Sequence, residues 1–202
     1  MWTYLNGEFI PKEDVRISPF DRGFLFGDSV YEVIPSYDNQ LFLFDEHLER
    51  LKSSLSITKI PIPDNLNNFN LLITELIQRN EYTNQAIYIQ ITRGEDAERS
   101  HVSSSTSSPT LFMSSTELEL NPYRLDPNKK GLEVRLEEDI RWKRCDVKAT
   151  TLLANVIPFH VGDKPEVDEV LFHNGKVINE GSKSNIFCVF DDLIVTPHSE
   201  QN

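Results

Sequence analysis

The segment 141–155 places Lys148 two residues after Asp146 and immediately before a largely apolar run. A lysine acts as a nucleophile only after it loses its proton, and an apolar wall favours that loss because it disfavours the ammonium form. Lys148 is therefore a candidate for covalent amine chemistry. Its own surroundings also fit an ordinary surface lysine at the head of a helix, so both interpretations stay open at this point.

A second polar segment, 180–185, reads Glu-Gly-Ser-Lys-Ser-Asn and lies between two predicted strands. A glutamate at a strand end beside a glycine can reach into a pocket. There, Glu180 would face a protonated ring nitrogen and keep it charged, so that the ring can accept electrons. The alternative is a polar turn with an exposed carboxylate.

Three cationic side chains are candidates for anion binding. Arg50 lies on a predicted helix, where a guanidinium can hold a phosphate. Arg99 and His101 are two residues apart in an extended loop, so they point the same way and could grip a carboxylate together. A solvated helix surface and a charged loop tip are the alternatives.

The segment 21–32 combines two glycines and two phenylalanines with polar residues and leads into a strand that starts at Tyr31. This composition predicts a packed, shaped loop. It is not a dinucleotide-binding fingerprint, because the glycine spacing is wrong and no helix is expected to follow.

Apolar periodicity and turn residues predict the elements that carry these side chains. Asn6-Gly7 predicts a hairpin between 2–5 and 8–10. Apolar residues at helical spacing over 69–77 predict a helix, and another is expected to begin with Asp45 as its N-cap. The other expected elements are a hairpin of 31–37 with 41–44, strands at 86–92, 110–114, 132–136, 169–173 and 176–178, a hairpin of 185–190 with 193–196, and a helix that starts near Lys148.

Turn residues without periodicity occupy 121–127 and predict a linker between a domain at 1–120 and a second domain at 128–202. Hairpins dominate the mixture of strands and helices, which favours the α+β class over a doubly wound sheet. The serine-rich residues 103–108 are expected to form an exposed flexible loop.

The bulk composition excludes several kinds of protein. The formal net charge of -12 argues against a general nucleic-acid binder, because a polyanion would be repelled. No apolar run approaches the roughly 20 residues of a membrane span, and the N-terminus lacks the features of a signal peptide. Cys145 and Cys188 are too few for a disulfide framework or a metal site and fit reduced thiols. A soluble, cytoplasmic protein without a metal is therefore expected.

Together, these segments resemble the fold-type IV pyridoxal-phosphate enzymes, which include D-amino-acid and branched-chain aminotransferases and aminodeoxychorismate lyase. The resemblance covers essentially the whole chain. Its motifs are DRGFLFGDSVYEV at 21–33, HLERL at 47–51, RWKRCDVKATTLL at 141–153 and EGSKSNIF at 180–187. The third motif is close to the form that is typical of D-amino-acid aminotransferases.

The resemblance implies a pyridoxal 5'-phosphate cofactor and a role for each candidate residue. Lys148 would hold the cofactor as an internal aldimine and act as the general acid and base. Arg50 would bind the cofactor phosphate and Glu180 the pyridine nitrogen, with Ser184 and Asn185 as further cofactor contacts.

The resemblance also implies a trap for the substrate α-carboxylate, formed by Tyr31 with Arg99 and His101. The last two residues would reach in from the neighbouring subunit of a homodimer with a shared active site. The substrates would be a small amino acid and a 2-oxo acid, with neither nucleic acid nor membrane as a partner. Positioning of the carboxylate against the lysine would decide which enantiomer reacts.

The implied fold is a small N-terminal α+β domain followed by a larger barrel-like α/β domain. Three features depart from the family pattern. The stretch 93–99 is one residue longer, and Lys183 stands where a small hydroxyl residue is common. A second phosphate-binding loop, G-[IV]-T-R, would follow residues 197–202, so the larger domain is expected to be truncated at its C-terminus.

The sequence thus predicts an aminotransferase that acts on D-amino acids of the D-alanine type with a 2-oxo acid as acceptor. One alternative is 4-amino-4-deoxychorismate lyase, which releases pyruvate to form 4-aminobenzoate. Tyr31 with Arg99 and His101 favours transamination, because the lyase does not need the carboxylate trap. The other alternative is a non-catalytic, truncated remnant of the fold.

Overall fold

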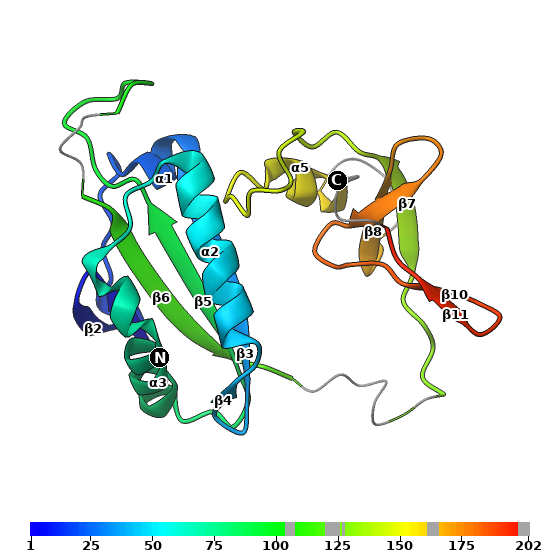
Figure 1. Cartoon of the computed structure of the whole chain (residues 1–202), viewed down its shortest axis with the longest axis horizontal. Helices are drawn as coiled ribbons and strands as arrows, with labels where there is room; N and C mark the ends of the chain where they lie inside the picture. Colours follow the sequence, from blue (N-terminus) through cyan, green and yellow to red (C-terminus); the bar gives the residue numbers. More distant parts are fainter. Residues whose placement is uncertain (104–107, 120–125, 127, 161–165, 198–202) are drawn as a thin grey trace. The chain divides into compact units, whose positions relative to one another are not determined.

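The computed structural model describes residues 1–103, 108–119, 126, 128–160 and 166–197 (Figure 1). The chain divides into two compact units. The first unit is Met1–Leu120 with Val147–Thr151, and the second is Asn121–Asp146 with Leu152–Asn202. The expected linker at 121–127 lies outside the described residues except for Asp126, as does most of the serine-rich loop expected at 103–108.

A six-stranded antiparallel sheet forms the first unit, in the order β2-β1-β6-β5-β3-β4. The Asn6-Gly7 hairpin between β1 and β2 is confirmed, with Asn6 and Gly7 both at positive φ. The strands are β1 (Trp2–Leu5), β2 (Glu8–Pro11), β3 (Ser29–Tyr37), β4 (Gln40–Leu41), β5 (Gln85–Thr92) and β6 (Thr110–Glu117).

Helices α2 (Phe44–Thr58) and α3 (Phe69–Asn80) cover one face of this sheet (Figure 1). Inward-facing residues of the helices and strands bury a continuous apolar core, which is the main favourable contribution to folding. The unit also contains a short helix, α1 (Arg22–Phe26), within the segment expected to be a loop. Two 3-10 turns, η1 (Lys12–Asp14) and η2 (Asp64–Asn68), complete it.

The expected N-cap of α2 is wrong by two residues. The helix begins at Phe44 after Leu43, whose backbone is left-handed with φ 50°, and no side chain caps it. Asp45 lies inside the first turn instead, where its negative charge interacts favourably with the positive end of the helix dipole.

The second unit contains a three-stranded sheet in the order β7-β8-β9 and a separate hairpin, β10-β11. Strands β7 and β8 are parallel, whereas β8 and β9 are antiparallel. The buried apolar side chains among its described residues are Val170 and Phe172. The elements are β7 (Val134–Glu138), α5 (Leu153–Val156), the 3-10 turn η3 (Ile157–Phe159), β8 (Glu169–His173), β9 (Ile178–Gly181), β10 (Cys188–Phe190) and β11 (Leu193–Val195).

The predicted α+β class is confirmed. The helix expected to start near Lys148 is not, because α5 begins at Leu153. The residues before it are extended and pair with the start of β3: Val30 and Ala149 form an antiparallel bridge. This pairing satisfies backbone groups of Lys148 that a helix would have used internally, so tertiary contacts override the local preference for a helix.

Candidate active site

Lys148 is fixed through its backbone to the first unit. Its carbonyl accepts a hydrogen bond from the Tyr31 amide at 2.9 Å, and its own amide donates to Ser54 Oγ in α2 at 3.3 Å. The Thr150 amide donates to the Ser29 carbonyl at 3.1 Å on the other side of the bridge. The backbone position of the lysine therefore does not depend on its side chain.

The Lys148 amine lies over an aromatic ring, with Nζ 4.3 Å from the ring centroid of Tyr31. The residue is partly buried, and within the described parts of the chain no carboxylate forms an ion pair with it. The Tyr31 ring lies in turn 5.8 Å from that of Tyr88. Burial, with the charge on Tyr31 as a second cause, raises the pKa of Tyr88 to about 12. The Tyr88 hydroxyl therefore keeps its proton and donates a hydrogen bond to Gln90 Oε1 at 2.9 Å.

Arg50 is held by a carboxylate that is fully buried. Glu32 accepts from Arg50 Nε at 2.5 Å and from Nη2 at 2.7 Å, and its Oε2 also lies 2.8 Å from His47 Nδ1. The hydrogen bond with Glu32 raises the pKa of Arg50 despite the opposing effect of burial. Half of the Arg50 side chain remains exposed, and Nη1 has no hydrogen-bond partner among the described residues. That nitrogen can donate to a phosphate.

Glu180 is located in the second unit, at the end of β9, where Arg141 donates a hydrogen bond to its Oε1. Arg141 also binds Asp139 through Nε at 2.9 Å and Nη2 at 2.7 Å, and its guanidinium lies 4.8 Å from the Phe172 ring centroid. The hydrogen bonds from Arg141 lower the pKa of Asp139 to about 2. This ionic cluster fixes Glu180 next to the Arg141 guanidinium.

The turn after Glu180 is organised by a second buried carboxylate, Glu169. It accepts hydrogen bonds from the hydroxyls of Ser182 at 2.6 Å and Ser184 at 2.7 Å. Burial would raise the pKa of Glu169, but these hydroxyls outweigh it and the pKa is lowered. Asn185 is exposed, and Lys183 places its Nζ 5.4 Å from the Phe159 ring centroid rather than in an ion pair with Glu180.

Arg99 and His101 share a single aromatic contact in the first unit. The Arg99 guanidinium lies 4.9 Å from the Phe26 ring centroid, and the His101 ring lies 5.6 Å from it. Both residues are exposed in the loop that follows β5. No ring contact or hydrogen bond within the described residues joins them to Tyr31.

Three of the residues that order this site were not singled out from the sequence. Glu32 lies at a core-facing position of β3, so a charged residue within an alternating apolar pattern was the available signal. Arg22 lies within the segment 21–32, but nothing local shows that its guanidinium is buried. Arg141 belongs to a short basic stretch, which gives no sign of its bonds to Asp139 and Glu180.

Comparison with known proteins identifies the family of this chain. The family model described as amino-transferase class IV matches residues 29–202. The D-alanine aminotransferase of Staphylococcus epidermidis is 35% identical over 194 residues, which cover 96% of this chain and 68% of that protein. The chain belongs to the class IV aminotransferase family.

Solved structures share the fold. The branched-chain amino acid aminotransferase of Escherichia coli matches with a TM-score of 0.82 and 20% identity, covering 97% of this chain and 67% of that one. A hypothetical aminotransferase from Mycobacterium tuberculosis, in a form with bound pyridoxal phosphate, matches with a TM-score of 0.80 and 18% identity over 98% and 71%. At these identities the likeness concerns the fold.

Class IV aminotransferases depend on pyridoxal phosphate, and the described residues fit this cofactor. The Lys148 amine has no ion-pair partner among them, Arg50 Nη1 is open as an anion donor, and Glu180 is held beside a cation. Each feature matches one part of the cofactor: the aldehyde, the phosphate and the ring nitrogen. In the described residues, no group of three or more His, Cys, Asp or Glu could hold a metal ion, and no helix is long and apolar enough to cross a membrane.

Proposed function

We propose that this protein transfers the amino group of D-amino acids, of which D-alanine is the simplest chiral example, to a 2-oxo acid. The observation that carries the proposal is the arrangement of Lys148, whose backbone is hydrogen-bonded to β3 and α2 while its amine lies over Tyr31 without an ion-pair partner among the described residues. The 35% identity to a D-alanine aminotransferase supports the substrate class.

Pyridoxal phosphate, when bound, supplies an electron-accepting ring that stabilises negative charge at the substrate Cα. Lys148 Nζ would act as a general base that removes the proton from the substrate Cα. It would then act as a general acid and deliver that proton to the carbon of the cofactor's aldehyde group. Arg50 would bind the phosphate through Nη1, in an orientation set by Glu32. Glu180, with Ser184 and Asn185 in the adjoining turn, would hold the ring, and its carboxylate would keep the ring nitrogen protonated.

Recognition of the substrate carboxylate would require two copies of the chain. Tyr31 would contribute from one subunit, and Arg99 with His101 from the other, as the resemblance to D-amino-acid aminotransferases implies; among the described residues of one chain, no ring contact or hydrogen bond joins Arg99 or His101 to Tyr31. We therefore propose a homodimer with a shared active site. The two free cysteines, Cys145 and Cys188, support a reducing compartment, and we propose the cytoplasm.

The first experiment uses visible absorbance. The purified protein with added pyridoxal phosphate should absorb near the wavelength of a lysine-bound cofactor, and borohydride should fix the cofactor to a peptide that contains Lys148. Lys148→Ala should abolish the fixation and lower kcat at least about a thousandfold. Lys143→Ala, an exposed lysine of the same segment, is the matched control and should behave like the native protein.

The second experiment separates the reactions. D-Alanine with 2-oxoglutarate should give pyruvate and glutamate, whereas aminodeoxychorismate should give no 4-aminobenzoate. Formation of 4-aminobenzoate without transamination would replace the proposal with the lyase. A protein that takes up no cofactor would overturn both enzyme functions and indicate a non-catalytic member of the family.

A further inference from the structure

Arg22 is a buried arginine whose guanidinium donates four hydrogen bonds, two to the carboxylates of Asp28 and Asp96 and two to backbone carbonyls of one loop. Its side chain is only 6% exposed, and it lies at the first position of α1, after the N-cap Asp21. Nε donates to Asp28 Oδ2 at 2.9 Å, while Nη1 donates to Asp96 Oδ2 at 2.9 Å. Burying a guanidinium is costly unless such partners compensate it, so this arrangement is specific.

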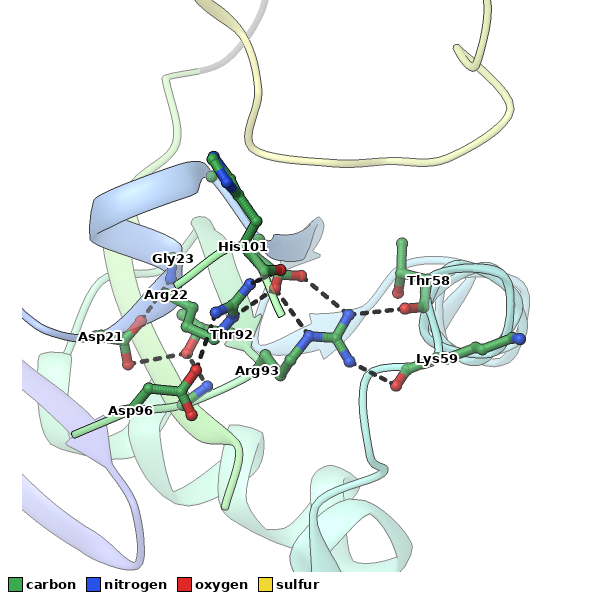
Figure 2. Close-up of polar contacts among 12 residues, drawn as sticks. Asp21, Arg22, Gly23, Thr58, Lys59, Thr92, Arg93, Asp96 and His101 are labelled. Atoms are coloured by element: carbon green, nitrogen blue, oxygen red, sulfur yellow. Dashed lines mark hydrogen bonds and ion pairs between the residues drawn. The ribbon is translucent and has the colours of Figure 1, made fainter. Parts of the chain in front are cut away.

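The remaining bonds of Arg22 reach the backbone of the Arg99–His101 loop (Figure 2). Nη1 also donates to the Ser100 carbonyl at 2.7 Å, and Nη2 donates to the His101 carbonyl at 3.2 Å. Ser100 lies between the two expected carboxylate ligands, Arg99 and His101, and His101 is itself one of them. Both side chains are exposed, so backbone bonds to Arg22 fix the part of the loop that solvent surrounds.

Phe26, four residues after Arg22 in α1, completes the support. Its ring lies 4.8 Å from the Arg22 guanidinium, 4.9 Å from that of Arg99 and 5.6 Å from the His101 ring. One short helix therefore holds the loop twice, through hydrogen bonds to its backbone and through an aromatic contact to its side chains. A rigid arginine fork can bridge several acceptors at fixed angles, which a lysine cannot do.

Arg93 provides a contrast within the same network (Figure 2). It shares Asp28 with Arg22, through bonds of 2.8 and 3.0 Å, but its other donors bind the carbonyls of Thr58 and Lys59 at the end of α2. Burial opposes the ionisation of Asp28, yet the bonds from the two arginines outweigh it and lower its pKa. The two arginines thus bind the same carboxylate, but of the two, Arg22 alone binds the carbonyls of Ser100 and His101.

We propose that Arg22 is a positioning residue for substrate: it holds Arg99 and His101 in the geometry that binds the amino-acid carboxylate. This inference rests on the proposed function. Loss of the Arg22 guanidinium would let the loop that carries Arg99 and His101 sample other conformations. The affinity for amino and 2-oxo acids would then fall, because these two side chains would no longer converge on the carboxylate. The chemistry at Lys148 would be affected much less.

The first test does not depend on activity. Arg22→Lys and Arg93→Lys both conserve charge and conserve the number of trypsin sites, so the rates of tryptic cleavage after Arg99 can be compared directly by mass spectrometry on the cofactor-loaded protein. Cleavage should be about tenfold or more faster in Arg22→Lys than in the native protein, and within about twofold of native in Arg93→Lys. Equal rates in the two variants would overturn the proposal.

The second test is a mutant cycle on KM for D-alanine. Arg22→Lys alone should raise KM about tenfold with kcat lowered less than about threefold. In a background that lacks both ligands, Arg99→Ala with His101→Ala, the same change should raise KM less than about twofold, because there is no longer a ligand to position. An undiminished effect in that background would show that Arg22 does not act through Arg99 and His101 and would refute the inference.

These experiments distinguish a failure of the proposed function from a failure of the proposed role of Arg22. If the native protein converts no amino acid, the proposed function fails, while the cleavage rates still decide whether Arg22 holds the loop. If Arg22→Lys does not fold, Asp96→Asn replaces it, because it removes a charge from the other end of the same bond. It should raise the cleavage rate and KM in the same direction by a smaller factor, and unchanged values would count against the proposal.

Discussion

The two units of this chain hold their functional residues by different means. In the first unit, Glu32 and Arg50 are carried by a strand and a helix that meet across a continuous apolar core. In the described part of the second unit, Val170 and Phe172 are the buried apolar side chains, and Glu180 is held by the ionic cluster of Arg141 and Asp139. Apolar packing supports the candidate residues of the first unit, and polar bonds support those of the second.

The difference matters because the two kinds of support respond differently to change. Loss of a buried apolar group costs transfer free energy and leaves a cavity, whatever the pH. The stabilisation that an ionic cluster provides depends on the protonation state of its members and on the geometry of each partner. We therefore expect the stability of the first unit to depend strongly on its core side chains, and the orientation of Glu180 in the second unit to depend on the charges around it.

The largest effect is expected from a pair of substitutions to alanine, one at a buried position of the first unit and one at an exposed position of the second. Ile89 in β5 is fully buried and Leu136 in β7 is 56% exposed. Ile89→Ala should lower the free energy of unfolding by about 2–5 kcal/mol, and Leu136→Ala by no more than about 0.5 kcal/mol. Urea unfolding followed by fluorescence can report each unit separately, since Trp2 lies in the first and Trp142 in the second. Equal losses of unfolding free energy in the two variants would contradict this expectation, because they would show that Leu136 in β7 contributes as much packing as Ile89 in β5.

The next effect concerns Glu180. Glu180→Gln keeps the size of the side chain but removes the charge that Arg141 faces and that would keep the ring nitrogen protonated. We expect kcat to fall by about a hundredfold, with a small change in the free energy of unfolding. Steady-state kinetics and urea unfolding measure both. A large loss of stability with normal kcat in the remaining folded protein would assign Glu180 a structural role instead.

The smallest effect is a dependence of the second unit on acid pH. The pKa of Asp139 is about 2 in the folded chain, below its ordinary value of 3.8, so its contribution to stability is complete above about pH 4 and is lost as the pH falls toward 2. Trp142 fluorescence should show a loss of stability in that window. Asp139→Asn should remove this part of the pH dependence, and an unchanged profile would exclude Asp139 as its source.

Much of the fold could be predicted from local patterns. The hairpin at Asn6-Gly7 and helix α3, with its apolar residues at helical spacing, lie where the sequence places them, because turn geometry and amphipathic periodicity are local properties. The helix expected near Lys148 was wrong for the opposite reason. That segment is extended through bonds to Ser29 and Tyr31, more than a hundred residues earlier in the chain, and no local pattern contains them.

The candidate site divides in the same way. The residue types and the order of the motifs determined by themselves the family, the cofactor and the identity of Lys148, Arg50 and Glu180 as candidates. Only the tertiary structure decided that Glu32 orients Arg50, that Arg141 faces Glu180 and that Arg22 holds the loop of Arg99 and His101. The physical reason is that chemistry requires particular side chains, which a sequence displays. Their orientation instead depends on buried hydrogen bonds between distant segments, which exist only after the chain has folded.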